Sequence, residues 1–215
     1  MPKPADRSAS ALIAFTSGAS ESQRWRSVGA QVLCAQLQVA APPAHVQADW
    51  LRDIAQQLVL EPGDVEPLSL ARARRRWPDA QAGEKAMAEW FRQLGLAGDL
   101  LASCPLSLMA CRGADTHHDA AQYGHSAFCN LFLSEDCAQD LIFPQLGLRI
   151  ALQRGRAVMF DTAQPHAVVA RGRAAFDAAE FSDLRQSSQV FLSWEVPIEA
   201  AGVAPLLALK IEPAG

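Results

Sequence analysis

The spacing of hydrophobic residues changes near the middle of the chain. Before residue 105, apolar positions recur every three or four residues, the spacing of an amphipathic helix. This pattern predicts helices over Val46–Leu60 and Ala80–Gly95, the first ended by Pro62-Gly63 and the second by Gly95. In Val28–Ala40 the pattern fits either an outer strand or a short helix.

From Pro105 onward the period becomes two, as in half-buried strands. Seven short, turn-bounded apolar segments are predicted as strands: Leu106–Cys111, Ser126–Ser134, Asp140–Phe143, Leu148–Leu152, Ala157–Phe160, His166–Ala170 and Gln189–Pro197. Short strands at this spacing are typical of a sandwich or barrel, and the preceding helices would cover one face of it. The expected fold class is therefore mainly β (α+β).

The length and composition fit one globular domain. Half of the 215 residues are hydrophobic and a fifth are charged, which is ordinary for a protein with a real core. We expect residues 1–215 to form a single domain, with a supporting helical region over 1–104, a β core over 105–197 and a C-terminal tail over 198–215.

Charge and cysteine content limit the location and partners of the protein. A net charge of −4 and a pI near 5.7 give no general attraction to nucleic acid or to anionic membranes. The chain has neither the pattern of a signal peptide nor an apolar run long enough to span a bilayer. Its five cysteines are dispersed, without a C-x-x-C pair, and we expect reduced thiols and a cytoplasmic location.

A basic run, Arg72 to Arg76, lies between the two predicted helices. It has two interpretations. The arginines could bind an acidic partner or an anionic substrate, or they could form a solvated helix face beside Trp77.

Histidines cluster in the strand region. Four of the five, His117, His118, His125 and His166, lie between Thr116 and Arg173. If His117 and Asp119 share a strand, both side chains point to one side and that of His118 points to the other. His166 begins a later predicted strand, which an antiparallel barrel can return to the same end of the cavity. Two histidines and one carboxylate form the triad typical of non-haem Fe(II), with open coordination positions.

The order His117-x-Asp119, Phe143-Pro144, Gly147, Arg154-Gly155-Arg156-Ala157-Val158-Met159-Phe160 and His166-x-Val168 resembles the Fe(II)/2-oxoglutarate-dependent oxygenases, and in particular their prolyl-hydroxylase-like branch. The resemblance covers roughly Leu106 to Pro197. It implies a double-stranded β-helix core of the jelly-roll or cupin type, with Fe(II) held by His117, Asp119 and His166. It also implies 2-oxoglutarate as cosubstrate, dioxygen as oxidant, and hydroxylation of a substrate coupled to oxidative decarboxylation to succinate and CO₂. Ascorbate is an optional further cofactor.

The chain departs from this family at one place. The family usually carries an arginine or lysine on its last core strand to bind the far carboxylate of 2-oxoglutarate, but Gln189–Glu195 has no basic residue. Arg185 is the first candidate for this anchor, followed by Arg173 and Arg171. Tyr123 and Asn130 are further candidate contacts for the cosubstrate, although Asn130 fits equally well as a satisfied core amide.

Two alternatives remain open at this stage. One is a cupin-type metal enzyme that does not use 2-oxoglutarate, and the other is an inactive barrel that acts as a binding or regulatory module. For an active enzyme, we expect a peptide side chain, an amino acid or a small metabolite as substrate. Nucleic acid is disfavoured by the acidic pI and by the lack of clustered basic and aromatic residues near the site. The sequence does not indicate an oligomeric state.

Overall fold

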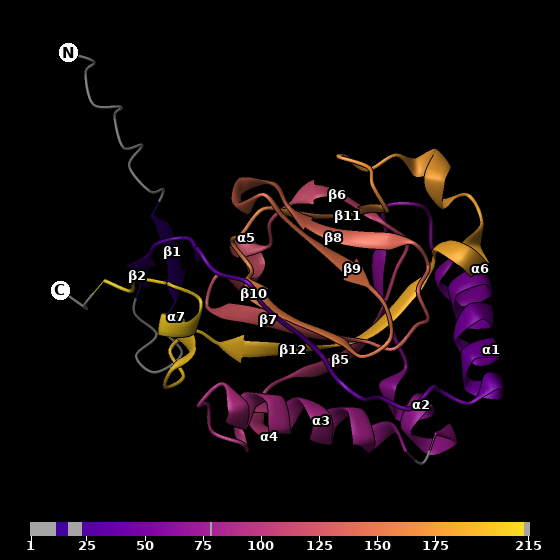
Figure 1. Ribbon diagram of the computed structural model, residues 1–215, viewed down its shortest axis with the longest axis horizontal. Coiled ribbons are helices and arrows are strands. Elements are labelled where there is room, and N and C mark those ends of the chain that lie inside the picture. Colours follow the sequence, from indigo (N-terminus) through magenta and orange to yellow (C-terminus); the bar gives the residue numbers. More distant parts are fainter. Residues whose placement is uncertain (1–11, 17–22, 78, 213–215) are drawn as a thin grey trace.

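The computed structural model describes residues 12–16, 23–77 and 79–212. Its strands are β1 (Ile13–Thr16), β2 (Gln23–Arg26), β3 (Leu33–Gln36), β4 (Val65–Leu68), β5 (Leu106–Cys111), β6 (Ala114–His117), β7 (Ser126–Phe132), β8 (Gln139–Phe143), β9 (Leu148–Leu152), β10 (Arg156–Asp161), β11 (His166–Ala170) and β12 (Gln189–Pro197). Its α-helices are α1 (Ala44–Asp53), α2 (Leu70–Arg76), α3 (Ala80–Gln93), α4 (Leu100–Ser103), α5 (Ala120–Tyr123), α6 (Leu184–Ser187) and α7 (Val203–Leu206). A π-helical turn, η1 (Ile54–Leu58), and two 3₁₀ turns, η2 (Pro144–Leu146) and η3 (Ala178–Phe181), complete the elements (Figure 1).

Two antiparallel sheets form the core (Figure 1). The larger has the strand order β3-β10-β7-β12-β5-β4, and the smaller has the order β6-β11-β8-β9. Between β5 and β12 the chain passes repeatedly from one sheet to the other, with the β8–β9 hairpin inside the smaller sheet. This is the topology of a double-stranded β-helix, so the predicted fold class is confirmed.

All seven predicted strands are present, with ends that differ from the prediction by at most two residues. The ambiguous segment Val28–Ala40 contains strand β3, which pairs with β10 at the edge of the larger sheet. Strands β1, β2, β4 and β6 were not predicted, because each has four residues and too few positions to show a period.

The two predicted helices are also present, with different endings. The first continues from α1 into η1, after which Val59 adopts a left-handed conformation with φ 48°. The second is α3, which ends at Gln93 shortly before Gly95, with φ 79°. Glycine adopts this conformation without the steric cost that a side chain would bring, as the sequence pattern predicted.

The larger sheet separates two hydrophobic regions. Its outer face packs against α3, which buries Met87, Trp90 and Phe91, and Figure 1 shows α3 and α4 running along that face. Its inner face looks toward the smaller sheet across a second cluster that contains Phe132 and Phe160. Along each strand, alternate residues therefore serve the outer core and the space between the sheets.

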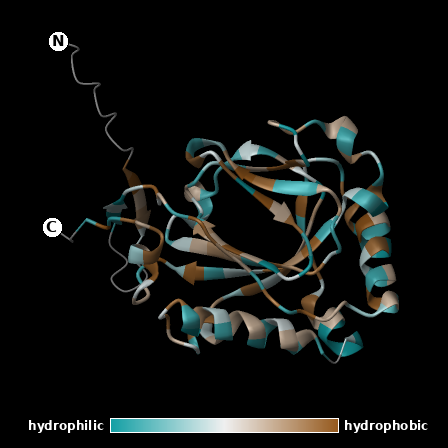
Figure 2. Cartoon of the chain, in the orientation of Figure 1, coloured by the Kyte–Doolittle hydropathy of each residue, from teal (hydrophilic) through white to brown (hydrophobic). Residues whose placement is uncertain are grey.

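The basic run forms α2, which stands out as hydrophilic in Figure 2. Ser69 begins the helix, because its Oγ accepts a hydrogen bond of 3.3 Å from the backbone N–H of Arg72. Three arginines pair with carboxylates of the neighbouring helices: Arg72 with Asp53, Arg74 with Glu84, and Arg76 with Asp49. These pairs favour the interpretation of the run as a helix face that joins α2 to α1 and α3.

Two further sequence predictions concern thiols and membranes. All five cysteines are free, and Cys104, Cys111 and Cys129 are buried. Within the described residues, every helix is too short or too polar to cross a membrane.

A buried ion pair joins the N-terminal segment to the barrel. Arg26 and Asp161 have fully buried side chains and form two parallel hydrogen bonds, of 2.7 and 2.9 Å. The Nε of Arg26 also donates to the carbonyl of Gly124 at 2.7 Å, and Asp161 accepts from the backbone N–H of Gly29 at 2.7 Å. Each charge is therefore almost completely hydrogen-bonded by the protein, the condition under which a buried pair is tolerated.

We predict that Arg26→Met destabilises the protein by about 3–5 kcal/mol, because the carboxylate of Asp161 would stay buried without its partner. The control is Glu180→Gln, which breaks the exposed pair between Arg173 and Glu180 and should cost less than about 1 kcal/mol. The free energy of unfolding, measured with urea, checks both values. Equal losses in the two variants would contradict the prediction.

Candidate metal centre and its cavity

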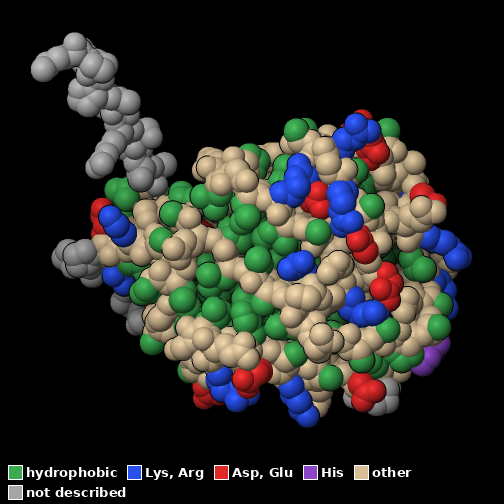
Figure 3. Space-filling view, in the orientation of Figure 1, with side chains coloured by type: hydrophobic (Ala, Val, Ile, Leu, Met, Phe, Trp, Pro, Cys, Tyr) green, Lys and Arg blue, Asp and Glu red, His purple; other side chains and the backbone are tan. Residues whose placement is uncertain are grey.

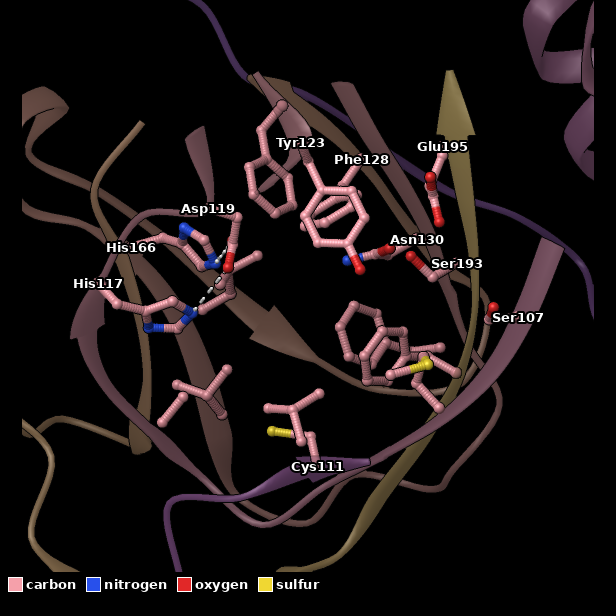
Figure 4. A pocket seen from close by; sticks show the side chains of 18 of the residues that line it. Ser107, Cys111, His117, Asp119, Tyr123, Phe128, Asn130, His166, Ser193 and Glu195 are labelled. Carbon is pink, nitrogen blue, oxygen red and sulfur yellow. Dashed lines mark ion pairs between the residues drawn. The ribbon is translucent and has the colours of Figure 1, made fainter. Parts of the chain in front are cut away.

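A cavity of about 300 Å³ lies between the two sheets. The residues that line it are Val65, Ser107, Met109, Cys111, Ala114, His117, Asp119, Gln122, Tyr123, Phe128, Asn130, Phe132, Leu141, Phe160, His166, Val168, Phe191, Ser193 and Glu195. Figure 4 shows His117, Asp119 and His166 on one side of this space and Ser107, Asn130, Ser193 and Glu195 on the other. The cavity thus has two chemically different polar walls.

Strand register explains the second wall. Ser107, Ser193 and Asn130 lie directly opposite one another on β5, β12 and β7, so their side chains form one row across the sheet. Glu195 and Phe128 form the next row toward the triad end of the barrel. In the other direction the lining becomes apolar, with Phe191 opposite Phe132 and their rings 5.1 Å apart.

The three predicted metal ligands lie together. His117 ends β6 and His166 begins β11, and the two residues are directly paired across these strands. Asp119 faces the Nε2 atoms of both rings: its Oδ1 is 3.9 Å from Nε2 of His117, and its Oδ2 is 3.7 Å from Nε2 of His166. One potential ligand atom from each residue lies within 4.8 Å of the other two.

Asp119 is positioned by the start of a helix and not, as predicted, by a strand. The strand ends at His117, and Asp119 occupies the N-cap position of α5 rather than a strand position. Its backbone N–H donates to the carbonyl of Thr162 at 2.7 Å, which holds the start of α5 against the turn before β11. Strand alternation was therefore the wrong physical reason for the His117–Asp119 pairing, although the two side chains do lie together.

Backbone carbonyls orient both histidines. Nδ1 of His117 lies 2.7 Å from the carbonyl oxygen of Asp115, and Nδ1 of His166 lies 2.9 Å from that of Gln164. A carbonyl accepts only, so in the neutral imidazole each Nδ1 carries the proton and each Nε2 is left with a lone pair toward Asp119. Hydrogen bonds of this kind set the tautomer and direction of metal-binding imidazoles.

Burial keeps His166 in the form that a metal requires. Desolvation lowers the pKa of His166 to about 4, against opposing effects from its hydrogen bond to Gln164 and from the charge of Asp119. The ring is therefore neutral near pH 7 and needs to lose no proton before binding a cation. His117 and Asp119 are more open, with side-chain exposures of 41% and 26%, so solvent reaches the triad from their side.

The two other predicted cavity residues, Tyr123 and Asn130, both line the space. The Tyr123 hydroxyl accepts a hydrogen bond from Nε2 of Gln122 at 3.1 Å. Burial, and then the charges of Glu195 and Asp119, raise the pKa of Tyr123, so its hydroxyl is a proton donor at neutral pH. Asn130 is 7% exposed, and its Oδ1 has no hydrogen-bond partner among the described residues.

The three arginines predicted as anchors lie outside the cavity lining. Arg171 pairs with Asp136 at 2.8 Å and with Asp140 at 3.2 Å, and Arg173 pairs with Glu180. Arg185 lies exposed on α6. Figure 3 shows basic and acidic side chains side by side over the part of the surface where β8 and α6 lie. This arrangement gives no support to an arginine anchor, and within the described residues the cavity is lined by neither arginine nor lysine.

Sequence reasoning missed Ser107, Ser193 and Glu195. A signal was present for all three. Val190, Leu192, Trp194 and Val196 alternate along the last strand and pack in the outer core. The intervening residues of β12 must then point between the sheets, which is where Ser193 and Glu195 line the cavity. Leu106, Leu108 and Ala110 of β5 alternate in the same way, which points Ser107 into the cavity.

No protein-family model matches the chain, and no curated protein matches its sequence. Among solved structures, a prolyl-4-hydroxylase from Pseudomonas putida is 17% identical, with a TM-score of 0.43 over 76% of this chain and 92% of that one. A 2-oxoglutarate complex of a viral collagen prolyl hydroxylase from Paramecium Bursaria Chlorella virus-1 is 11% identical, with a TM-score of 0.42 over 76% and 94%.

The cavity also contains a cysteine, and we predict that it is unreactive. Burial raises the pKa of Cys111 to about 12, so at pH 7.5 its sulfur is a protonated thiol, whereas alkylation needs the thiolate. Cys34 is exposed and should be alkylated first. Iodoacetamide labelling followed by peptide mass mapping checks the order of reaction. Modification of Cys111 before Cys34 in the folded protein would contradict it.

Proposed function

We propose that this protein is a mononuclear Fe(II) oxygenase that uses 2-oxoglutarate as cosubstrate and hydroxylates a small molecule or a peptide side chain. The observation that carries the proposal is the convergence of His117, Asp119 and His166 at the solvent-accessible end of a β-helix cavity. Two imidazoles and one carboxylate on one face of a metal leave coordination positions free for other ligands, as the chemistry of a non-haem iron oxygenase requires.

The residues present fit a divalent metal. Both Nε2 atoms and the carboxylate of Asp119 converge, and the histidines are already held in the required tautomer by carbonyls. Fe(II), when bound, would supply dioxygen activation. The chain itself positions the ligands, keeps His166 neutral, and bounds the cavity with apolar residues that exclude water from its inner end, among them Phe132 and Phe191.

Tyr123 is the donor that we assign to 2-oxoglutarate. Its hydroxyl can donate a hydrogen bond to a carboxylate, and its side chain lines the cavity. This neutral donor would replace the cation that the resembling family carries on its last strand. Neutral hydrogen bonds are roughly half as strong as charge-assisted ones, so we expect weaker binding of 2-oxoglutarate than an arginine would give.

We predict that Asp119→Ala lowers the affinity for Co(II), a spectroscopic substitute for Fe(II), by more than about 100-fold. Even groups that only support a metal ligand contribute roughly 10- to 100-fold, and Asp119 offers the single carboxylate of the triad. His118→Ala is the matched control, since His118 is exposed and does not line the cavity. Absorption titrations with Co(II) measure both variants. Unchanged affinity in Asp119→Ala would contradict the metal site.

We further predict that 2-oxoglutarate binds only to the metal-loaded protein, and that Tyr123→Phe weakens this binding by about 3- to 10-fold through the loss of one hydrogen bond. Calorimetry with Mn(II)-loaded and metal-free protein makes the comparison. The control is Tyr123→Phe without metal, which should give no heat of binding, as for the wild type.

One observation favours a second candidate, a cupin-type metal enzyme that does not use 2-oxoglutarate. The described cavity lining lacks lysine and arginine, and it includes the carboxylate of Glu195, which would repel a dicarboxylate. Metal binding without any 2-oxoglutarate binding in the calorimetry would support this candidate over the first.

A further inference from the structure

Glu195 places a carboxylate in the cavity without a partner. It lies on β12, is partly buried, and lines the wall opposite the metal triad in Figure 4. Within the described residues its side chain forms neither a hydrogen bond nor an ion pair, whereas Asp119, the other carboxylate of the lining, lies between the two histidines. A carboxylate in a confined space is stabilised by donors, and here the protein supplies none.

Asn130 is a second, independent indication that a ligand binds at this wall. Its Oδ1 is buried and unpartnered, and its side chain lines the same wall as Glu195. Buried polar atoms are hydrogen-bonded in more than about nine of ten cases, so the unpaired Oδ1 shows that the protein leaves the hydrogen bonding of this wall incomplete. Ser193 lies directly opposite Asn130 and two residues before Glu195 on β12, and it adds a hydroxyl to this wall.

The charge of the wall determines which kind of hydrogen-bond donor a ligand should carry. No arginine or lysine of the described lining can neutralise Glu195, so an anionic ligand group placed there would meet like charge. A protonated amine or a guanidinium would instead make charge-assisted hydrogen bonds to Glu195, with N–H groups to spare for the hydroxyl of Ser193.

Aromatic rings add a second attraction for a cation. Phe128 lies directly opposite Glu195 in the β7–β12 register, and the ring of Tyr123 is 5.0 Å from that of Phe128. Figure 4 shows these two rings between the triad and Glu195. A cation held by Glu195 would lie near these two rings, and contact with a ring face would attract it. The uncharged part of the ligand would pass along the rings toward the triad.

We propose that Glu195, Asn130 and Ser193 form a subsite for the protonated amino or guanidinium group of the substrate. The inference rests on the proposed metal oxygenase, because it places the rest of the substrate toward His117, Asp119 and His166. A cavity of about 300 Å³ limits the bound part to a small cationic metabolite or to one basic side chain of a peptide. The subsite thus defines the substrate class by charge.

The test measures binding of matched probes to the full-length protein loaded with redox-inert Zn(II). Butylguanidinium and butylurea have nearly the same shape but differ in charge, and glutarate represents an anion. The arginine tripeptide acetyl-Ala-Arg-Ala-amide tests whether the cavity binds the cation when it is part of a peptide. Dissociation constants come from calorimetry and ligand-observed NMR. The variants are Glu195→Gln, which keeps the shape of the side chain, and Glu66→Gln, which removes an exposed carboxylate from β4.

We expect butylguanidinium, the tripeptide or both to bind the wild type at least about tenfold more tightly than butylurea. Glu195→Gln should weaken the binding of the cation by about 10- to 100-fold and leave the binding of butylurea unchanged. Glu66→Gln should bind all probes as the wild type does. Preference for the free or the peptide-bound cation identifies the source of the substrate. Equal binding of butylguanidinium and butylurea, tighter binding of glutarate, or an unchanged Glu195→Gln variant would overturn the proposal.

Two readouts keep this inference separate from the proposed function. Co(II) titration of Glu195→Gln reports on the triad alone and should match the wild type, which also shows that the variant is folded. The probe series is repeated on metal-free protein, where the subsite should retain its preference for the cation. Absence of Co(II) binding to the wild type would refute the metal centre. Equal binding of the charged and uncharged probes would refute the subsite.

Discussion

The buried pair between Arg26 and Asp161 is the interaction on which the geometry of the site depends. Asp161 ends β10, five residues before His166, and Arg26 reaches from it to the carbonyl of Gly124, just beyond α5. The pair thus connects the turns that position both His166 and Asp119. Gly29 must approach closely for this: a Cβ there would lie 2.9 Å from that of Asp161. An N-terminal segment outside the β core therefore holds the two sides of the candidate metal centre together.

The double-stranded β-helix places the residues that pack in the outer core and those that line the cavity on opposite faces of the same strands. On β12, even-numbered residues such as Trp194 pack in the outer core against the helices, while Ser193 and Glu195 face the space between the sheets. The same alternation on β7 points Asn130 into the cavity. Because the outer face supplies most of the hydrophobic burial, the inner face can carry polar groups at little cost to stability.

The two walls of the cavity differ in charge, and this difference is central to the proposed function. A metal at the triad would offset the charge of Asp119, which leaves Glu195 as the net charge of the opposite wall. Arg171 and Arg173 are held by surface carboxylates instead. The barrel thus combines three residues that could hold a metal ion with a wall that favours cations. In the proposed function, charge would distinguish substrate from cosubstrate.

The sequence by itself determined the strands of the core, because period-two alternation is a local property that follows from the pleat of a strand. It also indicated His117, Asp119 and His166 as candidate metal ligands, since their residue types and order match a known ligand pattern, and the structure brings the three together. Only the tertiary structure decided how Asp119 reaches the histidines, because its place depends on a hydrogen bond to Thr162, 43 residues away in the chain. The same holds for Glu195 and for the arginines: what faces a cavity depends on strand pairing and on long-range ion pairs, which no local pattern of residues records.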